Sequence, residues 1–169
     1  EALPENVLPI MAYSLSKTYT LYGTRCGAMI CIAKTKEIAD EFKRVCEYSS
    51  RGSWSNSAKV AQVILSRIYG EPGLLERVDK ERAHYREMLI KRGRAFEEEA
   101  KKVGLKIVPF DAGFFISIPC SDPDAISAKL EKEGVFIVPL AKGLRVSVAS
   151  ISEDKCRKLP AIIKAAMEE

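Results

Sequence analysis

The sequence is poor in the residues on which several kinds of chemistry depend. It contains one histidine, His84, with no other metal-binding residue at a suitable spacing, so we interpret it as a residue on a helix surface. Its five cysteines are odd in number and include no C-x-x-C pair, which argues against a disulfide framework. Small buried thiols in a reducing compartment are the expected state, and the cytoplasm is the expected location.

Long apolar segments and blocks of one charge are also missing. No apolar run reaches the ~18 residues of a membrane-spanning helix, and we expect neither a signal peptide nor a membrane partner. The 27 Lys and Arg residues exceed the 23 Asp and Glu residues, but even the basic cluster at residues 91–94 lies among acidic residues. This pattern is typical of a solvated helix face, so nucleic acid is not an expected partner.

The chain is nevertheless long enough, at 169 residues and 47% hydrophobic, to bury a sizeable core. Its first half predicts strands at residues 6–16 and 26–33, and the second strand lacks the polar alternation of a half-exposed one. Helices are predicted at residues 35–49, with Thr35 as N-cap, and at residues 57–70. Both strands need neighbours on each edge, and the sequence offers few.

A long helical pattern connects this half to the next. Apolar residues recur at helical spacing across residues 71–104, and Gly93 is a soft position that would allow a bend. Two further helices are predicted after the N-caps Asp122 and Ser152. We expect Pro160 to kink or shorten the last helix, because an interior proline costs about 3 kcal/mol. Strands are predicted at residues 106–110, 113–119, 135–140 and 144–150.

The resulting order of elements predicts an α/β chain with two domains, at residues 1–81 and 82–169. The long helix begins in the first domain and ends in the second. Because the chain begins at Glu1, close to a strand and without methionine, we expect it to be a piece of a longer protein.

One segment, SLSKTYTLYGTRCG (residues 14–27), places an amine, hydroxyls and a guanidinium close together in the sequence. Partial desolvation at the end of an apolar strand favours the neutral, nucleophilic amine of Lys17. Ser14 and Ser16 would share one side of an extended strand, where both hydroxyls can donate to an anion. Arg25 follows the next turn, and its planar fork suits a phosphate. These groups predict a pocket for a phosphorylated aldehyde, although Ser-x-Ser-Lys alone is a weak motif.

This segment resembles the cofactor-lysine region of class I pyridoxal-phosphate aminotransferases, the aspartate and aromatic aminotransferase group. The shared pattern is Ser-x-Ser-Lys followed by Leu-Tyr-Gly-x-Arg-x-Gly. RGSWSN (residues 51–56) resembles the family's Arg-x-x-(Tyr/Trp)-Ser-Asn loop at the subunit interface. GLRVSVAS (residues 143–150) resembles the strand that carries the family's carboxylate-binding arginine. The three motifs occur in the family's order and together cover nearly the whole chain.

The resemblance implies a role for five residues. Lys17 would bind pyridoxal 5'-phosphate covalently and, once substrate displaces it, would move the proton at the substrate α-carbon. Ser14 and Arg25 would hold the cofactor phosphate. Arg145 would bind the α-carboxylate of the substrate. Arg51 would reach into the neighbouring subunit of a homodimer and bind a second carboxylate, which favours aspartate among the amino acid and 2-oxo acid substrates.

The resemblance also implies a fold and a missing part. The chain would be the C-terminal portion of a fold-type I PLP-dependent transferase: the end of the large-domain sheet, a long connecting helix and a small α+β domain. An upstream half would supply the rest of the phosphate cup, a ring stacked on the cofactor and an aspartate for the pyridine nitrogen. We therefore expect the longer parent to be the aminotransferase and the isolated chain to be inactive.

Several alternatives stay open from the sequence. The parent could prefer an aromatic amino donor, or could be a carbon–sulfur lyase or a cyclopropane-carboxylate synthase, which do not need Arg51. The isolated chain could serve as a non-catalytic oligomerisation or interaction module. Without the other motifs, Arg145 would be interpreted as an edge-strand charge and Arg51 as a surface residue.

Overall fold

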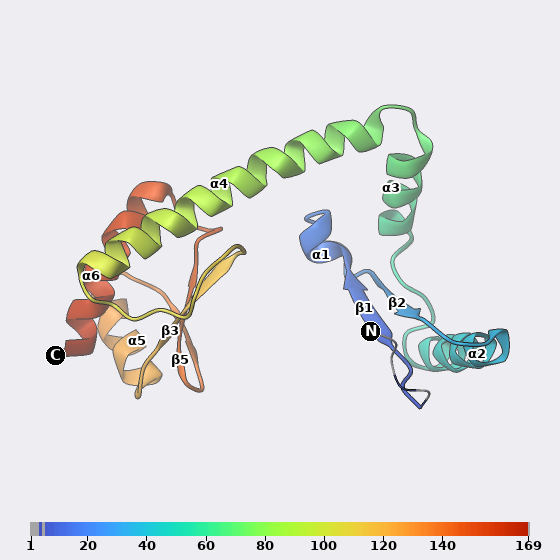
Figure 1. Ribbon diagram of the computed structural model, residues 1–169, viewed down its shortest axis with the longest axis horizontal. Helices are drawn as coiled ribbons and strands as arrows, with labels where there is room; N and C mark the ends of the chain where they lie inside the picture. The colour runs from blue at the N-terminus through green and yellow to red at the C-terminus, as the bar shows by residue number, and fades with distance from the viewer. Residues whose placement is uncertain (1–3, 5, 169) are drawn as a thin grey trace. The chain divides into compact units, whose positions relative to one another are not determined.

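The computed structural model of the chain describes residues 4 and 6–168, and Figure 1 shows its helices and strands. The chain divides into two compact units, Glu1–Glu76 and Arg77–Glu169, and helix α4 (Leu74–Lys102) runs through the boundary. The domain boundary predicted between residues 81 and 82 falls in the same helix. Within the described residues, every helix is too short or too polar to cross a lipid bilayer.

Unit 1 is built on an antiparallel pair of strands. β1 (Ile10–Ser14) pairs with β2 (Gly27–Cys31), and Ser14 lies opposite Gly27 at the end of the ladder. The chain between the strands forms the short helix α1 (Leu15–Thr18) and the 3-10 turn η1 (Tyr22–Thr24). The helices α2 (Lys36–Ser53) and α3 (Lys59–Gly70) follow.

Local signals in unit 1 were predicted correctly at some positions and wrongly at others. Thr35 is the N-cap of α2, as predicted, because its hydroxyl accepts a hydrogen bond from the Ile38 amide. The first strand, however, ends at Ser14, whose hydroxyl accepts from the Ser16 amide and caps α1. The prediction that these two serines share one side of a strand was therefore wrong. Arg51 lies in the last turn of α2 and not in a loop.

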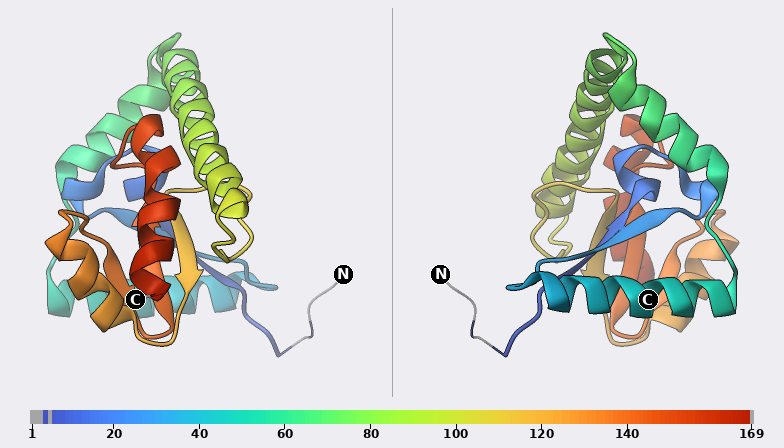
Figure 2. Two further views of the ribbon diagram at one scale, coloured as in Figure 1. Left: turned by 90° about the vertical axis from the view of Figure 1, so that its left-hand side faces the viewer. Right: turned by 90° about the vertical axis from the view of Figure 1, so that its right-hand side faces the viewer.

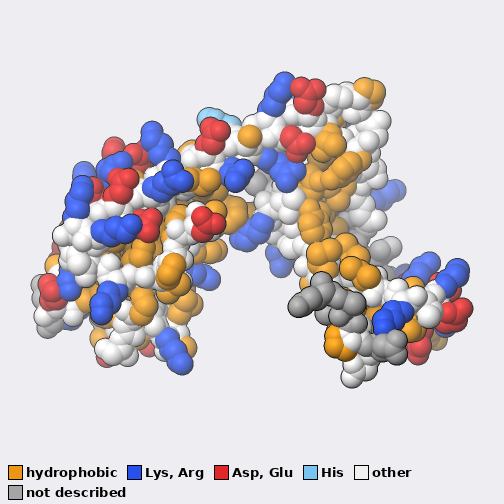
Figure 3. Space-filling model, in the orientation of Figure 1, with side chains coloured by type: hydrophobic (Ala, Val, Ile, Leu, Met, Phe, Trp, Pro, Cys, Tyr) orange, Lys and Arg blue, Asp and Glu red, His pale blue; other side chains and the backbone are white. Residues whose placement is uncertain are grey.

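Unit 1 exposes much of its apolar surface. The second strand was predicted to be buried on both faces, yet Met29 is 58% exposed and Ile32, just beyond β2, is 67% exposed. α2 contains no buried residue, and hydrophobic side chains gather along α3, where Val60 is 57% exposed (Figure 3). Contiguous apolar surface of this kind normally marks a contact with other protein. This exposure agrees with the expectation that both strands need neighbours on each edge.

Unit 2 contains a three-stranded antiparallel sheet with the strand order β3-β5-β4. Its elements are β3 (Phe115–Pro119), α5 (Pro123–Lys132), β4 (Val138–Leu140), β5 (Gly143–Ser147) and α6 (Glu153–Glu168). Figure 2 shows α6 lying across the strands beside the C-terminal half of α4. The buried core joins these helices to one face of the sheet through residues that include Phe96, Ile116, Ile118, Leu130, Leu144, Val146 and Ile163.

Alternation along β5 sends its side chains to opposite faces of the sheet. Leu144 and Val146 belong to the buried core. Arg145, between them, projects from the other face and pairs in register with Ser117 on one side and Val138 on the other. Because β5 is the central strand, the alternative interpretation of Arg145 as an edge-strand charge is wrong.

Two positions expected to weaken helices do not interrupt them. α4 continues through Gly93, where a Cβ atom would lie only 2.1 Å from Cε1 of Phe110, so the glycine admits an aromatic ring. α6 continues through Pro160, which is less than 2% exposed, so of the two outcomes predicted there, a kink or a shorter helix, the shorter helix is wrong. Residues 106–110 form no regular strand; they contribute a single bond from the Val108 amide to the Ser117 carbonyl at 2.9 Å.

The predicted start of α5 is confirmed. The Asp122 carboxylate accepts a hydrogen bond from the Ala125 amide at 3.0 Å, and Pro123 occupies the first turn, where its missing N–H costs nothing. The predicted cap of α6 is present as well, since the Ser152 hydroxyl accepts from the Lys155 amide.

Candidate active site

Lys17 lies on α1, the short helix that follows β1 directly. Leu15 anchors this helix with a side chain that is 3% exposed, whereas the Lys17 side chain is exposed. Lys17 Nζ donates a hydrogen bond to the Tyr22 hydroxyl over 2.5 Å and lies 4.1 Å from the centre of the same ring. The desolvation predicted for Lys17 is not present within unit 1, but the amine has a defined direction.

The Arg25 guanidinium contacts the main chain of the same tyrosine. The residue has a left-handed backbone, with φ 48°, at the end of η1. Its Nη1 donates to the Tyr22 carbonyl oxygen over 3.2 Å. Ser14 caps α1 one helical turn before Lys17, and its hydroxyl keeps a proton to donate while it accepts from the Ser16 amide. The structure therefore gathers three predicted residues, Ser14, Lys17 and Arg25, around one short loop of the chain.

Arg51 lies apart from these three residues. Its Nη1 donates to Ser55 Oγ over 2.6 Å at the end of α2. The two residues line an open groove of about 860 Å³ together with Tyr48 and Asn56. Ser14, Lys17 and Arg25 do not line this groove, so the structure does not bring Arg51 to the predicted cofactor residues of its own chain.

Arg145 belongs to unit 2, on the sheet face opposite the helices. Its Cζ lies 4.6 Å from the centre of the Phe115 ring, a cation–π contact. Its Nε is buried and, within the described part of the chain, has no hydrogen-bond partner. A buried N–H without a partner is costly, and a carboxylate would supply one, because guanidinium groups bind carboxylates with two parallel hydrogen bonds.

Two aromatic residues that contact predicted site residues, Tyr22 and Phe115, were not identified as such from the sequence. Tyr22 lies within the predicted cofactor segment, five positions after Lys17, but the sequence gives no sign that it contacts the amine. Phe115 lies far from Arg145 in the sequence and approaches it only because β3 and β5 pair with Ser117 opposite Arg145. The cross-strand register is the signal that identifies Phe115.

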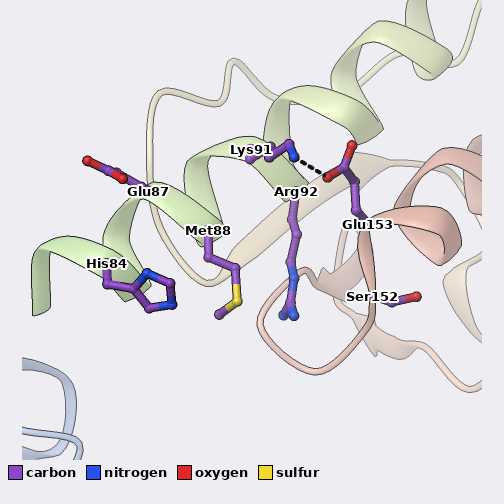
Figure 4. A pocket seen from close by; sticks show the side chains of 7 residues that line it. All are labelled: His84, Glu87, Met88, Lys91, Arg92, Ser152 and Glu153. Atoms are coloured by element: carbon purple, nitrogen blue, oxygen red, sulfur yellow. Dashed lines mark ion pairs between the residues drawn. The ribbon is translucent and has the colours of Figure 1, made fainter. Parts of the chain in front are cut away.

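A separate cleft of about 410 Å³ lies in unit 2 where α4 meets the start of α6 (Figure 4). His84 lines it from an exposed position on α4, which confirms the helix-surface interpretation of the histidine. The cationic residues beside it are engaged: Lys91 pairs with Glu153 at 3.3 Å, and Arg92 donates to the Ala149 carbonyl at 3.1 Å. None of the five predicted site residues lines this cleft.

The ion pairs at the start of α6 shift the pKa of a carboxyl group. Hydrogen bonds from Arg157 and then from Lys91 lower the pKa of Glu153 from its ordinary value of 4.5. In the same helix, burial raises the pKa of the Cys156 thiol above 9.0. Both shifts belong to the packing of α6 and to its surface ion pairs, not to the residues predicted to bind cofactor or substrate.

The residues around Tyr22 fit pyridoxal phosphate in their chemistry. A primary amine such as that of Lys17 can condense with an aldehyde. The Arg25 guanidinium, whose Nη1 donates to the Tyr22 carbonyl, and the Ser14 hydroxyl are donors of the kind that bind a phosphate. All three are exposed in unit 1 and therefore accessible to a ligand.

Unit 1 thus groups an amine with donors of the kind that suit a phosphate, and unit 2 presents a buried guanidinium nitrogen whose hydrogen bond a carboxylate would satisfy. The chain belongs to the aminotransferase class I and II family, whose family model matches residues 4–163. This match covers both units and all five predicted residues.

The individual relatives agree with this family. An aromatic amino acid aminotransferase of Cutibacterium acnes is 28% identical over 146 residues, which are 86% of this chain and 37% of the relative. The crystal structure of an aminotransferase from Anaerococcus prevotii matches with a TM-score of 0.93 and 35% identity, over 99% of this chain and 41% of that one.

The fold alone extends to an aromatic-amino-acid aminotransferase of Burkholderia pseudomallei, covalently bound to pyridoxal phosphate in its structure. It matches with a TM-score of 0.72 and 22% identity, over 94% of this chain and 40% of that one. The chain therefore spans about two fifths of the length of these relatives.

Proposed function

We propose that this chain is the C-terminal part of an aminotransferase that uses pyridoxal phosphate to move an amino group between an amino acid and a 2-oxo acid. The observation that carries the proposal is the grouping of Lys17 and Arg25 about Tyr22, within a chain that matches the family along nearly its whole length. The remaining three fifths of the relatives' length would contain the other cofactor contacts.

In this proposal, Lys17 acts on the aldehyde carbon and the proton, while Arg25 and Ser14 bind the phosphate. The Lys17 amine anchors the cofactor at its aldehyde carbon and, when substrate is bound, carries the proton to and from the substrate α-carbon. Arg25 and Ser14 bind the phosphate and so fix the cofactor at one end. When bound, pyridoxal phosphate supplies an electron sink for the charge left by that proton.

Arg145 binds the α-carboxylate of the substrate in this proposal. Its buried Nε, without a partner in the described residues, supports the role, because a carboxylate satisfies that donor and a second one at once. The ring of Phe115 stacks against the guanidinium and limits its orientations. A fixed guanidinium orients the α-carbon toward the amine that takes its proton.

Arg51 is assigned to the active site of a partner subunit in a homodimer. The assignment is supported by its separation from Lys17 and Arg25 and by the open groove that it lines. There it would bind the distal carboxylate of aspartate, glutamate or 2-oxoglutarate. Its bond to Ser55 would hold the side chain in place before the ligand arrives.

An aromatic amino donor is the second candidate, because the curated relative that is 28% identical is an aromatic amino acid aminotransferase. The two candidates differ in their need for Arg51. A dicarboxylic substrate requires a guanidinium for its second carboxylate, whereas an aromatic side chain does not. Removing the Arg51 side chain therefore distinguishes the dicarboxylic donor from the aromatic donor.

The experiment compares amino transfer from aspartate and from phenylalanine to 2-oxoglutarate, in a protein of the relatives' full length that contains this chain. Lys17→Ala should abolish both transfers. Lys36→Ala, which removes an exposed lysine paired with Asp40 at 2.6 Å, should leave both unchanged. Equal activity of the two variants would refute the role of Lys17.

Arg51→Leu is the second variant, and its effect is measured on the half-reaction with the amino donor. Loss of a charge-assisted hydrogen-bond pair should lower kcat/KM for aspartate by roughly tenfold to a hundredfold. The value for phenylalanine should stay within about threefold, since no distal carboxylate is involved. Because 2-oxoglutarate is itself dicarboxylic, the donor half-reaction is measured alone, by single turnover. An equal loss for both donors would remove the reason to favour aspartate.

A further inference from the structure

Tyr22 makes three contacts with the two cationic residues of unit 1. Its hydroxyl oxygen accepts a hydrogen bond from Lys17 Nζ at 2.5 Å. Its ring face lies 4.1 Å from the same nitrogen. Its main-chain carbonyl accepts from Arg25 Nη1 at 3.2 Å. Two like charges are thus oriented by one residue, although their mutual repulsion favours separation.

The loop that carries Tyr22 has an unusual backbone. Thr20 and Arg25, on either side of it, have positive φ angles of 55° and 48°, and a β-branched residue rarely adopts this conformation. The Leu21 amide donates to the Leu15 carbonyl at 3.3 Å and closes the loop on the anchored end of α1. Strained backbone of this kind persists where surrounding contacts hold a functional geometry.

Packing does not explain the position of Tyr22. Its side chain is 44% exposed, and it is not part of the buried core. The hydroxyl and the ring face are instead directed at Lys17. A phenol that is both a hydrogen-bond acceptor and a π surface suits an amine that must be held in one direction and still remain accessible.

We propose that Tyr22 is a positioning residue, which directs the Lys17 amine and the Arg25 guanidinium toward one ligand. The inference rests on the proposed function, in which that ligand is pyridoxal phosphate. The phenol and ring act on Lys17 alone, while the carbonyl acts on Arg25 and survives any substitution of the side chain. Replacing the side chain therefore separates the contribution to the amine from the rest of the site.

The variants remove the contacts one at a time. Tyr22→Phe deletes the hydroxyl and keeps the ring, and Tyr22→Leu deletes both. Tyr85→Phe is the matched control, because it removes a phenol from an exposed position on α4, where its ring contacts His84. Circular dichroism and thermal melting of each full 169-residue chain verify that the fold is unchanged.

The first measurement is the binding of pyridoxal phosphate to each chain, followed by absorbance as the Lys17 amine condenses with the aldehyde and releases one water. The loss of one hydrogen bond should raise the apparent dissociation constant in Tyr22→Phe by roughly threefold to tenfold. Tyr22→Leu should raise it further, and Tyr85→Phe should match the unaltered chain. Saturable binding that is unchanged in both Tyr22 variants would overturn the inference and leave the proposed function intact.

The second measurement needs no cofactor. In NMR spectra of the chain with ¹³C-labelled lysine, the Lys17 ε-methylene should be shifted upfield from other lysines by the ring that its amine faces. The shift should persist in Tyr22→Phe and disappear in Tyr22→Leu. If binding of pyridoxal phosphate proves diffuse, that result counts against the proposed function in this chain. An unshifted Lys17 signal would then overturn the role of Tyr22 separately.

Discussion

Replacing Gly93 by alanine distinguishes two explanations of the glycine within α4. The two explanations predict opposite signs for the change in the free energy of unfolding. If Gly93 is a soft position, alanine should stabilise the helix by up to about 1 kcal/mol, the difference in helix propensity. If Gly93 admits Phe110, alanine should introduce a clash. The added Cβ atom would lie 2.1 Å from Cε1 and 2.5 Å from Cζ of that ring, far inside the ~3.5–4.0 Å of a normal carbon–carbon contact.

The magnitude follows from these opposing effects. Overpacking costs about 1–3 kcal/mol, and the propensity gain of up to about 1 kcal/mol offsets part of it. The net expectation is a loss of up to about 2 kcal/mol in the free energy of unfolding of unit 2. In a Phe110→Ala background the clash is gone, so the same change at residue 93 should be stabilising. The change of sign between the two backgrounds is the signature of direct contact.

Hydrogen exchange is the appropriate assay, because the single tryptophan, Trp54, lies in unit 1 and cannot report on unit 2. A loss of 1 kcal/mol should lower the protection of peptides around Phe96 and Ile163 by about fivefold. Gly52→Ala is the control, since a Cβ at that position on α2 meets nothing within 4 Å. Greater protection in Gly93→Ala while the Phe110 ring is present would refute the packing explanation.

Three other predictions concern unit 2. Asp122→Ala should cost about 1 kcal/mol through loss of the N-cap of α5, measured as reduced exchange protection in that helix. Cys156 is fully buried and its pKa is raised by that burial, so alkylation at neutral pH should require unfolding, and rapid modification of the native chain would contradict the packing. Arg157→Met should raise the pKa of Glu153 toward its ordinary value of 4.5, measured by NMR titration. Because the folded-state pKa of Glu153 is lowered, its contribution to stability is present above about pH 4.5 and is lost as the pH falls through the folded value. If Arg157→Met unfolds in acid at the same pH as the unaltered chain, this contribution is contradicted.

The parts of the fold that were predictable depend on nearest neighbours in the sequence. Thr35, Asp122 and Ser152 were identified as N-caps because each precedes an apolar helical repeat, and each caps a helix in the structure. The surroundings of Gly93 and Pro160 were not predictable, because they depend on tertiary packing. The ring of Phe110 fills the space that Gly93 leaves, and Pro160 is buried in the core.

The candidate site likewise has features that the sequence predicts and features that depend on tertiary structure. The motif around Lys17 and Arg25 was identifiable because its residues lie within one short segment. The sequence did not indicate that Lys17 follows a capped turn and faces Tyr22, since Ser-x-Ser-Lys is equally compatible with a continuing strand. The position of Arg145 on a central strand was also unpredictable, because strand order is set by tertiary pairing.

The central claim is that Lys17 is the lysine that binds pyridoxal phosphate. Its most direct test is to incubate the protein with the cofactor, reduce the product with borohydride and map the modified lysine by peptide mass spectrometry. We predict that most of the label lies on Lys17 and that Lys17→Ala removes it without transferring it to exposed lysines such as Lys36. Label spread over exposed lysines, with Lys17 no more modified than Lys36, would contradict the claim.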